Sequence, residues 1–135
     1  MSSILKTTQL EQAGIRSILD LGMRSNLRRT LETQLEAYNT LETEVHMLAT
    51  QRGWELKDLD PAHRFVIDVH SRAKINGKKT DSLIADMVIQ RSTKGMIRSY
   101  KQLNQLEYVD YPVQAISKRL LDQETAIIQQ MKSFL

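Results

Sequence analysis

The sequence predicts an all-α protein in which two helical hairpins form a four-helix bundle. The chain has 5 glycines and 2 prolines in 135 residues, so it offers little material for the turns and strands of a β-sheet. Apolar residues recur every three or four positions along four segments, which is the spacing of helices with one buried face. Within each half of the chain the break between segments is short, which predicts that the two helices of each half are antiparallel neighbours.

The first hairpin is expected over residues 3–52. Its second helix, at about residues 26–52, carries the clearest apolar stripe, formed by Leu27, Leu31, Leu35, Tyr38, Leu41, Val45 and Leu48. The helix before it places on one face Ile4, Thr8, Glu11, Ile15, Ile18 and Gly22. A polar turn at residues 24–26 separates the two helices and offers Ser25 or Asn26 as the N-cap of the second.

The second hairpin is expected over residues 80–135. One helix is predicted from about Asp81 to Gln105, and another follows a break at residues 107–110 and continues to the end of the chain. Pro112 falls in the first turn of this last helix, where a missing N–H group costs nothing. The apolar stripe of the last helix consists of Val113, Ile116, Leu120, Glu124, Ile127, Met131 and Phe134.

The two hairpins show a weak internal repeat. A shift of 82 positions aligns Ile15-Arg16-Ser17 with Ile97-Arg98-Ser99 and carries Glu42 onto Glu124. A duplicated hairpin accounts for this match, and chance similarity is the alternative because the matching segments are short.

A long crossover, residues 53–79, joins the two hairpins. Gly53 is expected to end the preceding helix, and Asp60-Pro61 predicts a short extra helix at about residues 61–75. Short connections inside each hairpin and one long connection between them are typical of ferritin-like bundles. We therefore expect residues 1–135 to form a single ferritin-like domain.

Composition and charge exclude several classes of function. The chain has no cysteine, which removes disulfides, thiolate zinc sites and iron–sulfur clusters. The 19 basic and 16 acidic residues are interspersed, so the net charge of +3 does not predict a nucleic-acid or anionic-membrane partner. No apolar run approaches the roughly 18 residues that a membrane span needs. A cytoplasmic location is expected.

Three glutamates on the inward faces raise the question of a metal site. Ferritin-like bundles that bind two irons use one glutamate from each of two helices and a Glu-x-x-His pair from each of the other two. Glu11, Glu42 and Glu124 could point toward the centre, but the positions three residues after the last two are Val45 and Ile127. Both imidazoles are therefore missing, and we expect no metal and no other cofactor.

Two interpretations of these carboxylates stay open. Glu42 and Glu124 could lie at the edges of the stripes or pair with Arg16 or Arg98, because an unpaired buried carboxylate is costly. Alternatively, a divergent metal site in the bundle core could use four ligands, which would be Glu11, Glu42, His46 and Glu124. His63 and His70 have no acidic partners in the sequence pattern and are expected to be surface or packing residues.

The sequence contains no catalytic motif. There is no Gly-x-Ser-x-Gly and no glycine-rich phosphate loop, so no catalytic residues are predicted. Gly14 and Gly95 lie inside predicted helices, where glycine costs about 1 kcal/mol relative to alanine. A close approach to a neighbouring helix, or a kink, would explain their presence.

Six short segments carry a resemblance to a known family. They are Gly14-Ile15-Arg16, Gln51-Arg52-Gly53-Trp54, Ile84-Ala85-Asp86-Met87, Thr93-Lys94-Gly95-Met96-Ile97, Leu120-Leu121-Asp122-Gln123-Glu124 and Met131-Lys132-Ser133-Phe134-Leu135. Together they resemble the spore coat protein F family of endospore-forming Firmicutes. The resemblance covers nearly the whole chain, and its motifs are packing patterns. It implies a ferritin-like bundle related to proteins of the spore coat, with no enzymatic activity or ligand residues to carry over.

The function predicted from the sequence is that of a non-catalytic structural or interaction protein. Its expected partners are a second copy of the chain, as a dimer, or other coat proteins, and its location would be the cytoplasm or the spore coat. The alternative function is that of a divergent ferritin-like metal-binding or oxidase protein with a carboxylate-rich site in the bundle core. Carboxylates that converge in the centre of the bundle would favour this alternative.

Overall fold

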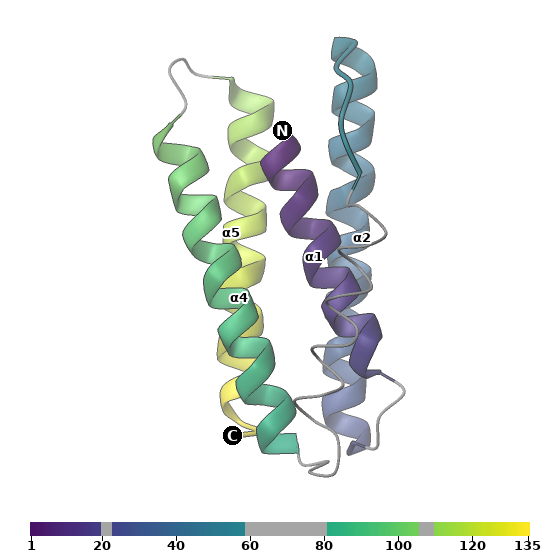
Figure 1. Ribbon diagram of the computed structural model, residues 1–135, viewed down its shortest axis with the longest axis vertical. Coiled ribbons are helices and arrows are strands. Elements are labelled where there is room, and N and C mark those ends of the chain that lie inside the picture. Colours follow the sequence, from purple (N-terminus) through teal and green to yellow (C-terminus); the bar gives the residue numbers. More distant parts are fainter. Residues whose placement is uncertain (20–22, 59–80, 106–109) are drawn as a thin grey trace.

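The computed structural model describes residues 1–19, 23–58, 81–105 and 110–135, and these residues form four α-helices (Figure 1). They are α1 (Ser2–Ile18), α2 (Ser25–Arg52), α4 (Asp81–Asn104) and α5 (Tyr111–Lys132). The predicted all-α arrangement is confirmed, and the bounds of α2, α4 and α5 agree with the prediction to within a few residues. The first helix is expected to reach Gly22, but α1 ends at Ile18, and Gly22 lies outside the described residues. The predicted extra helix at residues 61–75, together with His63 and His70, lies outside the described residues.

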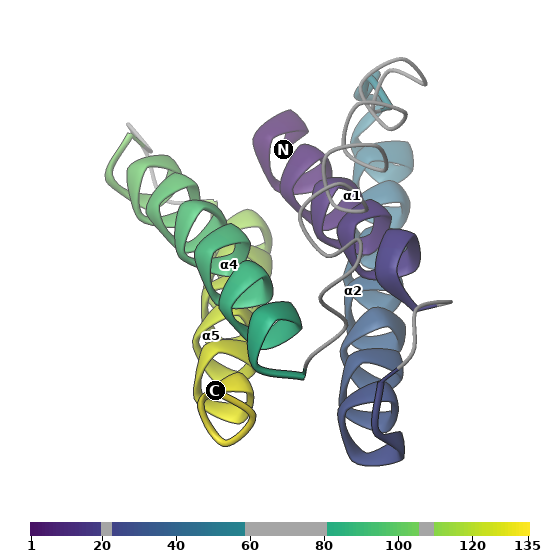
Figure 2. The same cartoon turned by 60° about the horizontal axis from the view of Figure 1, so that its bottom comes forward.

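The helices form a ring in the order α1, α2, α5, α4. The pairs α1·α2 and α4·α5 are in contact, as the two predicted hairpins require, and α1 also contacts α4 while α2 contacts α5. In Figure 1, α1 and α5 run downward and α2 and α4 run upward, so each helix is antiparallel to both of its neighbours in the ring. Figure 2 shows α1 lying over α2 and α4 lying over α5.

The helix ends follow from local sequence. Gly53 ends α2 with a φ of 67°, and the next residue, Trp54, donates its backbone N–H to Ala49 O at 2.8 Å. Asp110 is the N-cap of α5, and its side chain accepts a hydrogen bond from Val113 N at 3.4 Å. The predicted cap of α2 by Ser25 or Asn26 is wrong, because the N-cap is the preceding arginine and no side chain caps this end.

One ion pair joins two helix ends that are far apart in sequence. Arg52 Nη1, in the last turn of α2, lies 2.6 Å from Asp110 Oδ2. The Arg52 guanidinium lowers the pKa of the Asp110 carboxyl, mainly through their hydrogen bond and to a smaller extent through its positive charge. The same guanidinium lies 5.2 Å from the centre of the Trp54 ring, the range of a cation–π contact.

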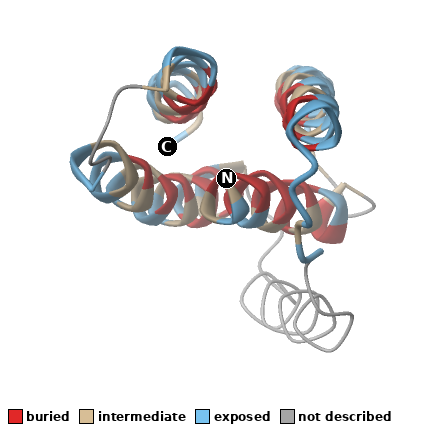
Figure 3. Cartoon of the chain, turned by 90° about the horizontal axis from the view of Figure 1, so that it is seen from above, coloured by how far each residue is buried: buried red, intermediate tan, exposed pale blue. Residues whose placement is uncertain are grey.

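The core lies where the predicted stripes face one another (Figure 3). Six of the seven residues in the predicted apolar stripe on the inner face of α2 are buried, and Leu35 is half-buried against the core. On α5 the stripe is buried as far as Met131, with Phe134 half-buried. Each fully buried leucine or isoleucine contributes about 1.5–3 kcal/mol relative to an exposed one, so these stripes account for the stability of the bundle. No described helix is both long enough and apolar enough to cross a membrane.

Candidate functional site

Four buried polar side chains meet in the centre of the bundle, one from each helix. They are Glu11 of α1, Tyr38 of α2, Ser92 of α4 and Glu124 of α5, and each is at most 1% exposed. Each lies on the buried face of its helix, among the apolar residues that pack the core. We call these four residues the central cluster.

The central cluster is only partly hydrogen-bonded. Ser92 Oγ donates to Glu11 Oε2 at 3.3 Å. The Tyr38 hydroxyl faces the Glu124 carboxyl and the Ser92 hydroxyl without reaching good hydrogen-bond geometry with either. Among the described residues, Glu11 Oε1 and both carboxyl oxygens of Glu124 have no hydrogen-bond partner. Such groups are costly in a core, so their protonation state matters for stability.

Burial shifts both carboxyls toward their neutral forms. It raises the pKa of Glu124 from 4.5 to about 9, and the nearby Glu11 carboxylate adds to this effect. It raises the pKa of Glu11 from 4.5 to about 7, against the opposing charges of Arg91 and Arg98. Burial also raises the pKa of the Tyr38 hydroxyl well above its usual value. At neutral pH the central cluster therefore holds a proton on Glu124.

Two glycines make room for ionisable side chains around the central cluster. A methyl group at Gly14 of α1 would overlap the guanidinium of Arg91, which approaches Glu11 from α4. A methyl group at Gly95 of α4 would lie 2.7 Å from Glu124 Oε1. The cost of glycine inside these helices is thus offset by close approach of a neighbouring helix, one of the two explanations that the sequence analysis offers.

Glu42 and His46 lie outside the central cluster. The Glu42 side chain is 22% exposed and accepts hydrogen bonds from Gln9 Nε2 at 3.0 Å and Gln12 Nε2 at 2.6 Å. His46 Nε2 lies 3.7 Å from Glu42 Oε1. Glu42 follows the buried Leu41 directly, so it falls at the edge of the buried apolar stripe of α2 and not at its centre. It lines an open polar pocket of about 510 Å³ between α1 and α2.

The predicted metal ligands are therefore divided between two places. Glu11 and Glu124 come together in the centre, while Glu42 and His46 lie together at the edge of α2. In the part of the chain that the structure describes, no three histidine, aspartate or glutamate side chains are placed to hold one metal ion. The expectation that Glu42 and Glu124 lie at the edges of the apolar stripes is correct for Glu42. It is wrong for Glu124, which is fully buried.

The arginines have partners other than those predicted for them. Arg16 Nη2 donates to Gln12 Oε1 at 3.3 Å, so it reaches Glu42 only through an amide. Arg98 Nε donates to Thr7 Oγ1 at 3.2 Å, and its charge lowers the pKa of Glu11 and Glu124 from nearby.

Three residues around the site were not predicted as members of it. The sequence pattern places Tyr38 only in an apolar stripe, and it does not indicate that Ser92 or Arg91 lies near a carboxylate. One signal for Ser92 exists in the sequence, since α4 carries small residues at Ala85, Ser92, Gly95 and Ser99. These residues share the buried face of α4, where a small side chain leaves room for groups from other helices.

Comparison with known proteins adds no assignment. No family model matches the chain, and no curated protein or solved structure is found to be similar to it.

Proposed function

We propose that this protein is a non-catalytic structural or interaction protein, a helical building block with ferritin-like connectivity that resembles spore coat protein F. The observation that carries the proposal is the burial of the central cluster. Glu11, Tyr38 and Glu124 are the titratable side chains of the central cluster, and all are at most 1% exposed. A general acid or base must come within hydrogen-bond reach of its substrate, which these side chains cannot do beneath four packed helices.

The central cluster has a structural role in this proposal. Each helix contributes one polar side chain to it, so a different pairing or register of the helices would leave a carboxyl group against apolar side chains. Buried polar groups in other helical assemblies fix register and partner choice at some cost in stability. The order of the antiparallel ring supports ferritin-like connectivity, because each hairpin is closed by a short link and a long crossover joins α2 to α4.

The outer surface supports a role in protein contacts. Several large apolar side chains are exposed on different helices, among them Met47 of α2, Ile97 and Tyr100 of α4, and Tyr111 of α5. Ile97 and Tyr100 are neighbours on one face of α4, and adjoining exposed apolar side chains are typical of sites that contact other proteins. The partners we propose are further copies of this chain or other coat proteins, in the cytoplasm or the spore coat.

Sedimentation velocity of the wild-type chain over a wide range of concentration tests this function. We expect species larger than a monomer that dissociate on dilution, because the exposed apolar side chains lose contact with water on association. A chain that remains monomeric at the highest concentration would contradict self-association, the part of the proposal that names further copies of this chain as partners.

A second candidate function, cation binding, is favoured by the unpaired oxygens of the central cluster. Two carboxylates, a phenol and a hydroxyl offer oxygen ligands of the type that Mn²⁺, Mg²⁺ or Ca²⁺ prefers. Arg91 and Arg98 oppose this function because they already supply positive charge to Glu11. If a cation binds, Mn²⁺ raises the melting temperature of the wild type but not of Glu124→Gln, whereas equal responses exclude the central cluster as the binding site.

A further inference from the structure

The outer side of α2 presents a regular exposed stripe. Its residues are spaced by 4, 3, 4, 3 and 4 positions, and we call them the α2 stripe: Arg29, Thr33, Glu36, Thr40, Thr43 and Met47. All six are exposed, Met47 by 58%. The three threonine hydroxyls each donate to a carbonyl one turn earlier in α2, for example Thr40 Oγ1 to Glu36 O at 3.1 Å. These hydroxyls need no further partner, so the stripe can be covered without leaving them unpaired.

The outer side of α4 presents a stripe with the same spacing. We call its residues the α4 stripe: Asp86, Gln90, Thr93, Ile97, Tyr100 and Asn104. Ile97 is 48% exposed and Tyr100 is 51% exposed, and their spacing of three positions makes them neighbours on the outer surface of α4. Lys94 lies beside this stripe and forms no ion pair with any described residue.

Alternating intervals of three and four are the spacing with which two helices pack along a shared seam. Aligned from their first residues, the two stripes are complementary. Arg29 falls opposite Asp86, and Glu36 falls beside Lys94. The aligned positions then bring small threonine side chains, Thr40 and Thr43, opposite the large Ile97 and Tyr100. Large side chains against small ones allow two helices to approach closely.

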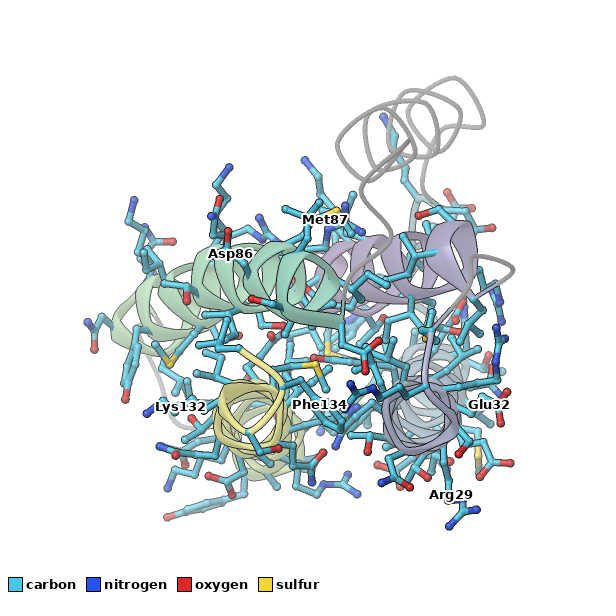
Figure 4. All side chains as sticks on the ribbon, turned by 90° about the horizontal axis from the view of Figure 1, so that it is seen from below. Arg29, Glu32, Asp86, Met87, Lys132 and Phe134 are labelled. Atoms are coloured by element: carbon cyan, nitrogen blue, oxygen red, sulfur yellow. The ribbon has the colours of Figure 1, made fainter. Side chains whose placement is uncertain are left out.

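The two stripes cannot meet within one molecule. α2 and α4 occupy diagonal corners of the helix ring, each in contact with α1 and α5. Figure 4 shows Arg29 and Glu32 pointing outward from α2, and Asp86 pointing outward from α4 on another side of the bundle. A contact between the stripes must therefore join two copies of the chain.

The fold places the α2 stripe and the α4 stripe at the same height along the bundle, as a contact between two copies displaced sideways requires. α2 and α4 run in the same direction and both begin at the lower end in Figure 1. The first turns of these helices are at the same level, because Arg24 N donates to Asp81 Oδ1 at 3.3 Å. A second copy in the same orientation, displaced sideways, would therefore bring its α2 alongside α4 in a parallel arrangement with Arg29 near Asp86.

We propose that copies of this protein associate head to tail, with the α4 stripe of one copy packed along the α2 stripe of the next. This inference rests on the function proposed above and names its partner as a second copy. When two copies are joined in this way, one copy still has a free α2 stripe and the other a free α4 stripe. Further copies can therefore add at both ends, and association continues as an open row instead of stopping at the dimer expected from the sequence. A parallel contact between two identical stripes is disfavoured, because it would place Arg29 opposite Arg29 or Asp86 opposite Asp86. An antiparallel contact between identical stripes would leave Arg29 opposite Met47 and Asp86 opposite Asn104, without the charge pairs of the head-to-tail contact.

Charge exchange tests the proposal without changing net charge. One variant, Asp86→Arg with Lys94→Glu, reverses the charges along α4, and the other, Arg29→Glu with Glu36→Lys, reverses those along α2. Each variant alone places like charges in every contact, so we expect its self-association to weaken by about tenfold or more. In an equimolar mixture both kinds of contact become complementary again, and association returns toward the wild-type level.

The matched control is Lys118→Glu with Asp122→Lys, which exchanges two exposed charges on α5 at the same net charge. It should associate as the wild type does. Circular dichroism and thermal unfolding establish that every variant is folded, and sedimentation velocity measures association. Variants that associate normally while the wild type also associates would overturn the head-to-tail contact but leave the interaction function intact. A monomeric wild type would overturn both the head-to-tail contact and self-association, and recovery of association only in the mixture supports the contact.

Discussion

Gly95 of α4 lies directly against the carboxyl group of Glu124 on α5. A methyl group at position 95 would be 2.7 Å from Oε1 and 3.0 Å from Cδ of this fully buried side chain. The contact ties the close packing of α4 and α5 to the presence of a carboxyl group in the core. Because the carboxyl is enclosed, it cannot swing away at low cost as an exposed glutamate could.

Gly95→Ala is expected to destabilise the protein by about 1–3 kcal/mol, because the added methyl overpacks the core. The sign is informative, since helix propensity alone would favour alanine by about 1 kcal/mol. Urea or guanidinium unfolding monitored by circular dichroism measures the change.

The control for this prediction is the same substitution in a Glu124→Ala background. With the carboxyl removed, Gly95→Ala should be neutral or stabilising, because only its helix propensity remains. An equal loss of stability in both backgrounds would show that Glu124 is not what requires glycine at this position.

The stability of the fold should fall as pH rises. The folded-state pKa values of Glu11 and Glu124, about 7 and about 9, lie above their usual value of 4.5. Their contribution is therefore fully present below about pH 4.5 and is lost as pH rises through about 7 for Glu11 and about 9 for Glu124. Each carboxyl contributes a slope of up to about 1.4 kcal/mol per pH unit within its window.

Glu124→Gln should flatten this pH dependence, because an amide does not titrate. The free energy of unfolding, measured from pH 5 to pH 9 for the wild type, Glu124→Gln and the exposed control Glu36→Gln, checks the prediction. Parallel curves for all three would place the pH dependence elsewhere in the chain.

Tyr38→Phe is expected to be neutral or to stabilise the protein by up to about 1 kcal/mol. The Tyr38 hydroxyl is buried and has no hydrogen-bond partner among the described residues, so its removal relieves a desolvation cost. Tyr100→Phe, at an exposed position, serves as the control. A clear loss of stability for Tyr38→Phe alone would instead reveal a hydrogen bond to Glu124 or Ser92.

Asp110→Ala should lower the melting temperature more than Asp110→Asn does. The asparagine keeps an oxygen that can accept from Val113 N, whereas the alanine removes both this cap and the contact with Arg52. Thermal unfolding of the two variants beside Arg52→Ala separates the cap from the ion pair. Equal melting temperatures for the alanine and asparagine variants would exclude capping as the role of Asp110.

Periodicity was sufficient to predict the helices, but not the partners of the central cluster. The predicted apolar stripes of α2 and α5 are buried, because a long amphipathic helix packs its apolar face against the core. The internal repeat suggested that Glu42 and Glu124 are equivalent, and the structure separates them. Glu42 lies between the buried Tyr38 and Val45 at the same spacing as Glu124 between Leu120 and Ile127. In α2, however, the preceding residue Leu41 is buried and takes the place in the core, whereas Gln123, which precedes Glu124, is only half-buried.

The identity of the remaining cluster residues depends on how the helices are arranged in space. Ser92 lies 81 positions after Glu11 along the chain, and their contact requires α1 and α4 to be neighbours. A tyrosine in an apolar stripe gives no sign of where its hydroxyl points until the opposing helix is placed. The role of Gly95 likewise depends on a side chain from another helix.

The central claim is that Glu11 and Glu124 form a closed structural cluster that holds a proton in place of a metal ion. Elemental analysis tests it most directly, on protein purified without chelator or affinity tag from cells supplemented with iron and manganese. We predict no stoichiometric metal. A content of roughly one to two metal ions per chain, lost in Glu124→Gln, would contradict the account and establish the central carboxylates as a metal site.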